Sequence, residues 1–136
     1  MAIVGVLALV AAPSYSAYVE RTRVNKAIVD IQAVNALIKS YYLDNRDYPD
    51  TLSQVGAAGK RDPWGRPYVY QVFRTPADKG HARKDKNLVP INTDYDLYSV
   101  GKDGASSPPL TAKTSRDDVV RANDGAFVGL ASTYTQ

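Results

Sequence analysis

Residues 95–104 read Tyr-Asp-Leu-Tyr-Ser-Val-Gly-Lys-Asp-Gly, and this stretch joins an expected strand to an expected turn. The alternation of residue types before the glycines predicts a short strand, with Leu97 and its alternate neighbours on one face. Gly101 and Gly104 then bracket the next two residues, and glycine adopts the positive φ that a tight turn needs. The stretch therefore predicts a strand that ends in a turn presenting the carboxylate of Asp103.

A second acidic point follows downstream at Asp117 and Asp118. Between the two points, residues 105–114 are mostly Ser, Thr, Pro and Ala, so we expect a loop that buries little and has few hydrogen-bond partners of its own. A calcium ion would close such a loop, because calcium takes about 6–8 oxygen ligands from carboxylates, carbonyls and water. We expect a calcium site formed by the side chains of Asp103, Asp117 and Asp118 and by the backbone carbonyl of Val100.

Two structural alternatives stay open for these acids. Asp103 on its own fits an ordinary strand-ending turn with a solvated side chain. Asp117 and Asp118 fit the N-cap of a short helical turn over residues 119–122, which is a common use of Asp and is compatible with metal binding. The spacing of the acids excludes an EF-hand, which needs Asp at alternate positions and Glu at the twelfth.

Composition limits the possible classes of protein. The chain has 136 residues, enough for one domain with one core. It contains no cysteine, which excludes a disulfide framework and a thiolate metal site. Its net charge of +3 is too small to indicate nucleic-acid binding by itself.

The chain starts with an apolar stretch, since residues 1–12 contain nothing polar. As a helix they would span about 18 Å, against about 30 Å for a bilayer core. We expect residues 1–13 to be a partial membrane or filament-core helix, the second half of a longer apolar helix whose first half is missing from this sequence. Residues 14–136 would then form the globular domain, and Pro13 would kink or locally melt the helix between them.

One long helix is predicted over residues 15–43, because apolar residues recur there every three or four positions. The turn formers of residues 44–49, which end in proline, stop this helix. Its predicted buried face comprises Val24, Ala27, Ile28, Ile31, Val34, Ile38, Tyr41 and Tyr42.

Short strands and turns follow the helix. Residues 68–73 have strand composition, and Phe127, Val128 and Leu130 are expected to pack onto the core. Trp64 is expected to pack on the helix. One long helix followed by a small antiparallel β-sheet with long loops is an α+β fold.

The excess positive charge is local to residues 74–91, which we call the basic segment and which carries the full +3 of the chain. Arg83, Lys84 and Lys86 could contact DNA or an acidic partner. We favour a solvated hairpin loop, because no aromatic residue is interleaved for base stacking. His81, the single histidine, is expected to be an exposed loop residue.

Three motifs, in this order along the chain, resemble the type IV pilin-like proteins, and within them the major pseudopilin of type II secretion systems. They are Tyr-Tyr-Leu-Asp-Asn-Arg-Asp-Tyr-Pro at 41–49, Asp-Pro-Trp-Gly-Arg-Pro-Tyr-Val-Tyr at 62–70, and the quoted stretch at 95–104. The Pro13 that follows an apolar helix adds to the resemblance. The run Trp-Gly-x-Pro-Tyr joined to Asp-Leu-Tyr-Ser-x-Gly-x-Asp-Gly is its most specific part.

The resemblance implies a structural subunit of a helical filament in protein secretion, with calcium in its last loop. It implies copies of the same chain, minor pseudopilins and inner-membrane assembly proteins as partners. It also implies a location at the bacterial inner membrane and periplasm, or in a cell-surface filament, with the apolar helix in the membrane before assembly. The alternatives are a type IV pilus subunit and a DNA-uptake minor pilin that binds nucleic acid through the basic segment. The sequence has no nucleophile elbow, histidine-rich cluster or phosphate-binding loop that would indicate an enzyme.

Overall fold

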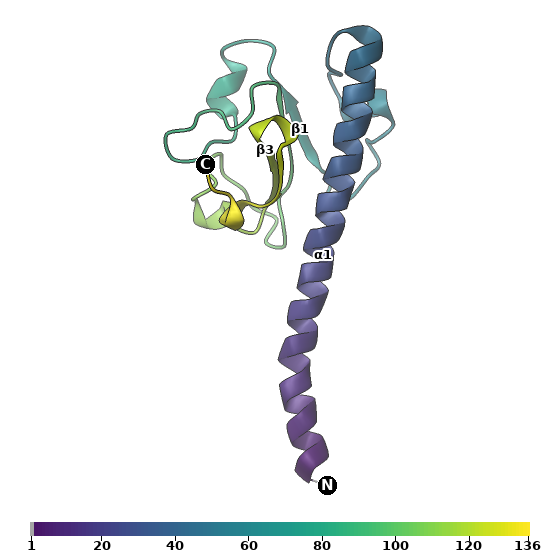
Figure 1. Cartoon of the computed structure of the whole chain (residues 1–136), viewed down its shortest axis with the longest axis vertical. Coiled ribbons are helices and arrows are strands. Elements are labelled where there is room, and N and C mark those ends of the chain that lie inside the picture. The colour runs from purple at the N-terminus through teal and green to yellow at the C-terminus, as the bar shows by residue number, and fades with distance from the viewer. Residues whose placement is uncertain (1) are drawn as a thin grey trace.

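The chain folds as one long helix laid against a four-stranded antiparallel sheet (Figure 1). The computed structural model describes residues 2–136, with side chains from residue 14 onward. The elements are the helix α1 (Ala2–Asn45) and the strands β1 (Val69–Val72), β2 (Tyr95–Ser99), β3 (Val119–Ala122) and β4 (Phe127–Leu130). The predicted α+β class is confirmed, while the side chains of the apolar stretch 1–12 lie outside the described range.

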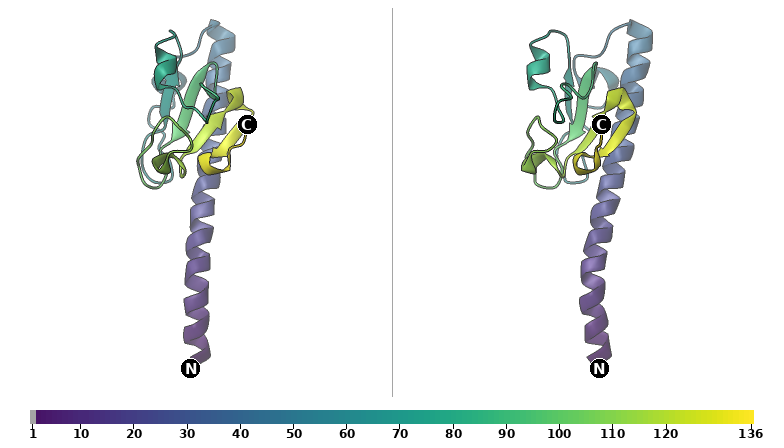
Figure 2. Two further views of the ribbon diagram at one scale, coloured as in Figure 1. Left: turned by 90° about the vertical axis from the view of Figure 1, so that its left-hand side faces the viewer. Right: turned by 60° about the vertical axis from the view of Figure 1, so that its left-hand side comes forward.

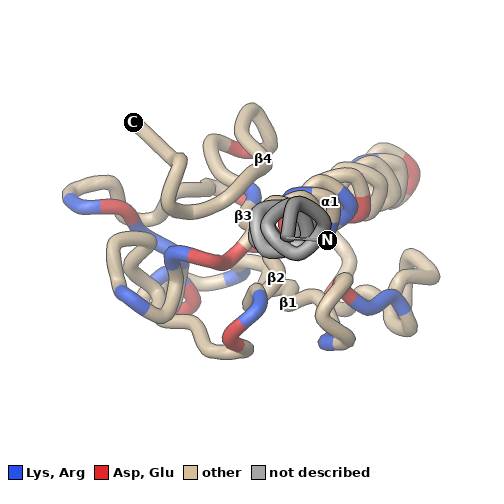
Figure 3. Tube along the Cα trace, turned by 90° about the horizontal axis from the view of Figure 1, so that it is seen from below, with Lys and Arg blue, Asp and Glu red and all other residues tan. Residues whose placement is uncertain are grey.

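The sheet keeps the order of the sequence, β1-β2-β3-β4, and every neighbouring pair is antiparallel. Ser99 at the end of β2 faces Val119 at the start of β3. Viewed from below, the strands lie along one side of α1 (Figure 3). This pairing places the chain that leaves β2 next to the chain that enters β3.

Helix α1 runs through Pro13 without a break, and it extends well beyond the sheet at its N-terminal end (Figures 1 and 2). The expected local melting at Pro13 is therefore wrong. Proline removes one backbone hydrogen bond, and the helical residues on either side keep the rest of the ladder in a helix of 44 residues. Within the part of the chain that the structure describes, no helix combines the length and apolar content needed to cross a membrane.

The helix ends at Asn45, two residues beyond the predicted end. The Asn45 side chain donates to the carbonyl of Tyr41 (2.9 Å), and the N–H of Arg46 donates to the carbonyl of Tyr42 (2.7 Å). Arg46 has a φ of 58°, which turns the chain out of the helix.

The predicted apolar face of α1 is the centre of the main core. Ala27, Ile31, Val34 and Ile38 are at most 1% exposed, and they share a cluster with residues of β2 and β3. The prediction fails only at the far edge of the face, where Tyr42 is 36% exposed and its ring stacks on Tyr48 with centroids 4.5 Å apart. The sheet thus buries one stripe of the helix, as a 3.6-residue period requires.

Loops cover the opposite face of the sheet and form a second core. Val120 and Ala122 of β3 point into it, and they meet Leu110 and Ile91 from the long loops. Leu110 is 2% exposed. The long loops are therefore packed parts of the domain.

Polar contacts fasten the chain between α1 and β1 to the helix. The Trp64 indole donates to Glu20 Oε1 (2.9 Å), which confirms that Trp64 packs on the helix. Tyr68 donates to Asp30 Oδ2 (2.8 Å). Burial alone would raise the pKa of Asp30, but the Tyr68 hydrogen bond and two nearby lysine ammonium groups outweigh it and lower that pKa. Asp30 therefore stays charged and holds this connection against α1.

Candidate metal centre

The turn predicted after β2 is present and lies against the chain that enters β3. Gly101 and Gly104 have φ values of 71° and 70°. A Cβ atom on Gly101 would lie 2.3 Å from the backbone carbonyl oxygen of Asp117. Only glycine fits this approach, so the contact fixes the turn beside the two acids that precede β3.

Three carboxylates converge at this contact. Asp103, Asp117 and Asp118 each offer an oxygen, and these oxygens lie within 4.8 Å of one another. Asp103 is exposed, Asp117 is half-buried and Asp118 is buried. The structure thus brings together the three side chains that the sequence predicted, because β2 and β3 are neighbours and their loop ends meet. We call residues 101–118 the acidic loop.

Hydrogen bonds use only part of the oxygen capacity of these acids. Asp117 Oδ2 accepts the N–H of Asp103 (2.8 Å), and Asp103 Oδ1 accepts the N–H of Ala105 (2.9 Å). The buried Oδ1 atoms of Asp117 and Asp118 have no hydrogen-bond partner within the described part of the chain. Buried carboxylate oxygens are costly unless a donor or a cation satisfies them.

The surroundings disfavour negative charge at Asp117 and Asp118. Burial raises the pKa of Asp117, and the neighbouring Asp103 carboxyl adds to this effect. Burial also raises the pKa of Asp118, to about 6, although Ser106 and Arg83 favour its charged form. A hard cation supplies what such a cluster lacks, since calcium and magnesium select oxygen ligands. The residues present therefore fit a divalent cation, whereas the Val100 carbonyl stays a prediction.

Two expectations for the acidic loop are wrong. Residues 119–122 form the strand β3, so Asp117 and Asp118 do not cap a helical turn there. The loop 105–114 also has many partners of its own. Ser115 Oγ donates to the Ser107 carbonyl (2.7 Å) and accepts the Ser107 N–H (3.0 Å). Protein contacts thus close much of this loop.

The basic segment supplies some of those contacts, so the interpretation as a solvated hairpin loop is wrong for part of it. The Lys84 N–H donates to the Pro108 carbonyl (2.9 Å), and the Leu110 N–H donates to the Lys84 carbonyl (2.8 Å). Arg83 is 2% exposed and therefore cannot take part in an exposed DNA-binding surface. His81 is exposed, as predicted.

The sequence did not predict that Arg66 contacts the acidic loop. Its guanidinium donates to the carbonyls of Gly101 (3.2 Å) and Lys102 (3.4 Å). A Cβ atom on Gly104 would lie 2.4 Å from that guanidinium. Arg66 stands in the Trp-Gly-x-Pro-Tyr run, so this motif is connected to the turn of the acidic loop. No local pattern in the sequence marks the connection, because the partners are 35 residues apart.

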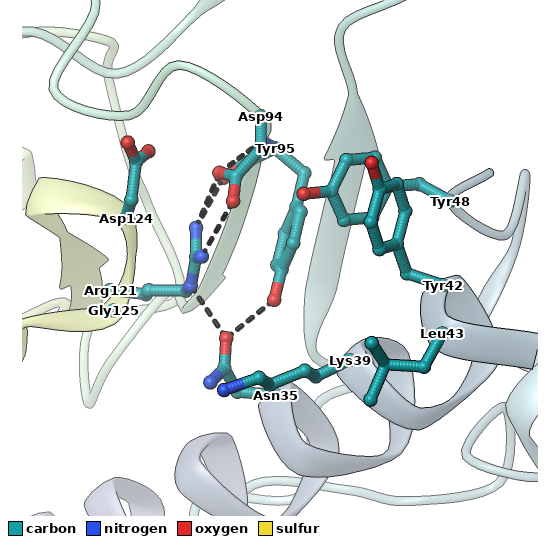
Figure 4. A pocket seen from close by; sticks show the side chains of 10 residues that line it. All are labelled: Asn35, Lys39, Tyr42, Leu43, Tyr48, Asp94, Tyr95, Arg121, Asp124 and Gly125. Carbon is teal, nitrogen blue, oxygen red and sulfur yellow. Dashed lines mark hydrogen bonds and ion pairs between the residues drawn. The ribbon is translucent and has the colours of Figure 1, made fainter. Parts of the chain in front are cut away.

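A pocket of about 450 Å³ contains another polar cluster, in which Arg121, Asp94 and Asp124 all have hydrogen-bond partners (Figure 4). The Arg121 guanidinium lies 3.9 Å from the centre of the Tyr95 ring, donates to both oxygens of Asp94 (2.8 and 2.9 Å) and donates to Asn35 Oδ1 (2.7 Å). Asp124 accepts hydrogen bonds from the N–H and the hydroxyl of Thr93 at 2.7 Å each. These contacts connect α1 to β3, and they leave the acidic loop as the better metal centre.

Named relatives align with most of the chain at about 30% identity. Type II secretion system core protein G of Pseudomonas aeruginosa is 30% identical over 123 residues, which cover 75% of this chain and 75% of that protein. Core protein G of Dickeya chrysanthemi is 31% identical over 107 residues, 75% of this chain and 70% of that protein. The type IV major pilin protein PilE of Neisseria gonorrhoeae is 29% identical over 138 residues, 92% of this chain and 80% of that protein. No family model and no solved structure matches the chain.

A long N-terminal helix on a four-stranded antiparallel sheet, together with sequence similarity to such relatives, defines the class: the chain is a type IV pilin-like protein. Within that class it belongs to the family of type II secretion system core protein G, the major pseudopilins. The resemblance seen in the sequence motifs is confirmed.

Substitution of Gly101 tests the close approach on which this site depends. Gly101→Ala places a Cβ atom against the Asp117 backbone and keeps a φ of 71°, so we expect a loss of about 2 kcal/mol or more in the free energy of unfolding. Gly59→Ala is the matched control, because a Cβ atom there meets nothing within 4 Å. Urea unfolding of both variants measures the difference, and equal stability of the two would contradict this geometry.

Proposed function

We propose that the chain is a structural subunit of a type II secretion pseudopilus, a helical filament built from copies of this protein. The observation that carries the proposal is the match of about 30% identity to core protein G over three quarters of both chains, on a pilin-like fold. As in those relatives, the role we propose is structural, and we expect no catalysis.

The exposed side of α1 supports packing between copies. Tyr18, Val29 and Leu43 are 62%, 61% and 57% exposed. They are 11 and 14 residues apart, close to three and four turns of a helix, so they share one side. The sheet covers the other side, where Ile31 lies. An extended helical side with exposed large apolar residues is suited to contact with other helices.

The N-terminal end of α1 projects beyond the sheet (Figure 1). We propose that residues 1–13 belong to the filament core and lie in the inner membrane before assembly, and that residues 14–136 face the periplasm. Minor pseudopilins and inner-membrane assembly proteins are the further partners that this role requires.

The DNA-uptake alternative is not favoured. It required Arg83 together with Lys84 and Lys86 on an exposed surface, and Arg83 is 2% exposed. Relatives from secretion systems and pili point to a filament subunit in its place.

We further propose that calcium binds the acidic loop. Asp103, Asp117 and Asp118 would hold the ion, with the Val100 carbonyl as a further ligand. The support is the convergence of three carboxylates, two of which have a buried oxygen with no hydrogen-bond partner among the described residues. The ion would supply positive charge between the turn after β2 and the start of β3, and would thereby join two segments that otherwise repel.

Thermal unfolding with and without calcium tests the metal site. A ligand that binds only the folded state stabilises it, by about 2.7 kcal/mol at a hundredfold excess over Kd. We therefore expect calcium to raise the Tm by several degrees relative to excess chelator, and magnesium to raise it less. Asp117→Asn should remove most of the gain, whereas Asp44→Asn, on the exposed end of α1, should keep it. A Tm that calcium leaves unchanged would exclude the site.

A charge on the exposed side of α1 tests the filament role. Val29→Asp should abolish filament assembly and type II secretion in the source bacterium, because a carboxylate would be buried between copies. Its effect on unfolding should stay below about 0.5–1 kcal/mol, since Val29 is exposed in the subunit. Val89→Asp is the control, a valine 54% exposed in the basic segment, and it should preserve assembly. Normal secretion by the Val29 variant would contradict the proposed packing.

A further inference from the structure

The basic segment places a buried arginine inside the candidate metal centre. The Arg83 side chain is 3% exposed, and its Nη2 donates to Asp118 Oδ2 (2.9 Å), while the Asp118 side chain is fully buried. Ser106 completes a triangle, because it accepts from Arg83 Nη1 and donates to the same Asp118 oxygen. One oxygen of Asp118 therefore has two donors, and the other has none within the described part of the chain.

Two contacts with β2 also hold Arg83 in place. Its backbone N–H donates to the buried Asp96 Oδ2 (2.7 Å), and its guanidinium lies 4.4 Å from the centre of the Tyr98 ring. Both partners belong to β2. Arg83 is thus held through its backbone N–H and through the two terminal nitrogens of its buried guanidinium, so its charge is a permanent feature of the acidic loop.

The position of Arg83 determines the net charge of the candidate metal centre. Asp103, Asp117 and Asp118 together bring three negative charges to one place when ionised. Arg83 offsets one of them through Asp118 and leaves two, which matches a single divalent cation. Arg66 donates to carbonyl oxygens of the turn, and Lys102 and Arg116 also belong to the acidic loop. Among the described side chains, Arg83 alone forms an ion pair with one of the three carboxylates.

From this arrangement we propose that Arg83 is a built-in cation of the metal centre, which neutralises Asp118 and sets the site for one divalent ion. The inference rests on the proposed calcium site and adds a residue that lies outside it in sequence. Arg83 and the metal ion would both neutralise Asp118, so the presence of either one reduces the electrostatic stabilisation that the other adds. The acidic loop therefore keeps its fold without calcium more readily than three unopposed carboxylates would.

The proposal predicts an order of calcium affinities that depends on charge. Arg83→Gln keeps a hydrogen-bond donor and removes the positive charge, so it should bind calcium at least tenfold more tightly than the unmodified chain. Arg83→Lys keeps the charge and should stay within about threefold of it. Asp118→Asn should bind most weakly, because it leaves the least negative charge in the centre. The double variant Arg83→Gln/Asp118→Asn restores the original balance and should bind as the unmodified chain does.

Isothermal titration calorimetry with calcium chloride on the full chain and its four variants measures this order. Tighter binding by Arg83→Gln, with near-equal binding by the double variant, supports the built-in cation. Equal or weaker binding by Arg83→Gln overturns it and leaves the calcium site intact, since a purely structural arginine predicts that its loss weakens the site. Binding by Arg83→Gln alone would exclude calcium from the unmodified chain and overturn the proposal that Arg83 sets the site for one divalent ion. Binding by neither would overturn both.

Thermal unfolding followed by circular dichroism provides a second test, which applies even if Arg83→Gln does not fold without calcium. Loss of Arg83 leaves a buried carboxylate without its cation, so Arg83→Gln should be less stable than the unmodified chain in excess chelator. Calcium should then restore its circular dichroism spectrum and raise its Tm by more degrees than it raises that of the unmodified chain. A smaller calcium-induced rise in Arg83→Gln would overturn the proposal.

Discussion

Burial of one stripe of α1 against the sheet is the contact on which the rest of the domain depends. The apolar residues that β2 and β3 turn toward the helix need cover from water, and a helix with large apolar residues on two sides needs cover on both. Ile31 and Ile38 on the helix meet Leu97 and Val119 on the central strands, so each element completes the other. The same contact decides which side of α1 remains free for other copies.

The order of the strands also determines where the metal centre forms. Because β2 and β3 are neighbours, the turn at Gly101 and the chain at Asp117 meet at one edge of the sheet. Their carboxylates repel one another and two of them are partly or fully buried, so the edge needs positive charge. Arg83 supplies part of that charge from a segment remote in sequence, and we propose that calcium supplies the remainder.

The sequence predicted the features that depend on local patterns. Periodicity identified the buried face of α1, alternation identified β2, and the glycines identified the turn that presents Asp103. Features that depend on distant partners could not be read in this way. Arg83 lies 35 residues from Asp118 in a segment rich in lysine, and no local sequence pattern indicates its burial. Asp117 and Asp118 suit a helix cap and the approach to a strand equally well, so only the pairing of residues 119–122 with both neighbouring strands decides between them.

Exposed apolar residues on α1, relatives from secretion systems and pili, and a domain confined to one side of the helix are consistent with a filament whose helices lie inside. Electron cryo-microscopy of the protein recovered from the envelope of its source bacterium tests that arrangement most directly. We predict a helical filament with α1 packed against other copies along Val29 and Leu43, the sheet outside it, and density for an ion at Asp117. A closed oligomer, or a filament with α1 on its outer surface, would contradict it.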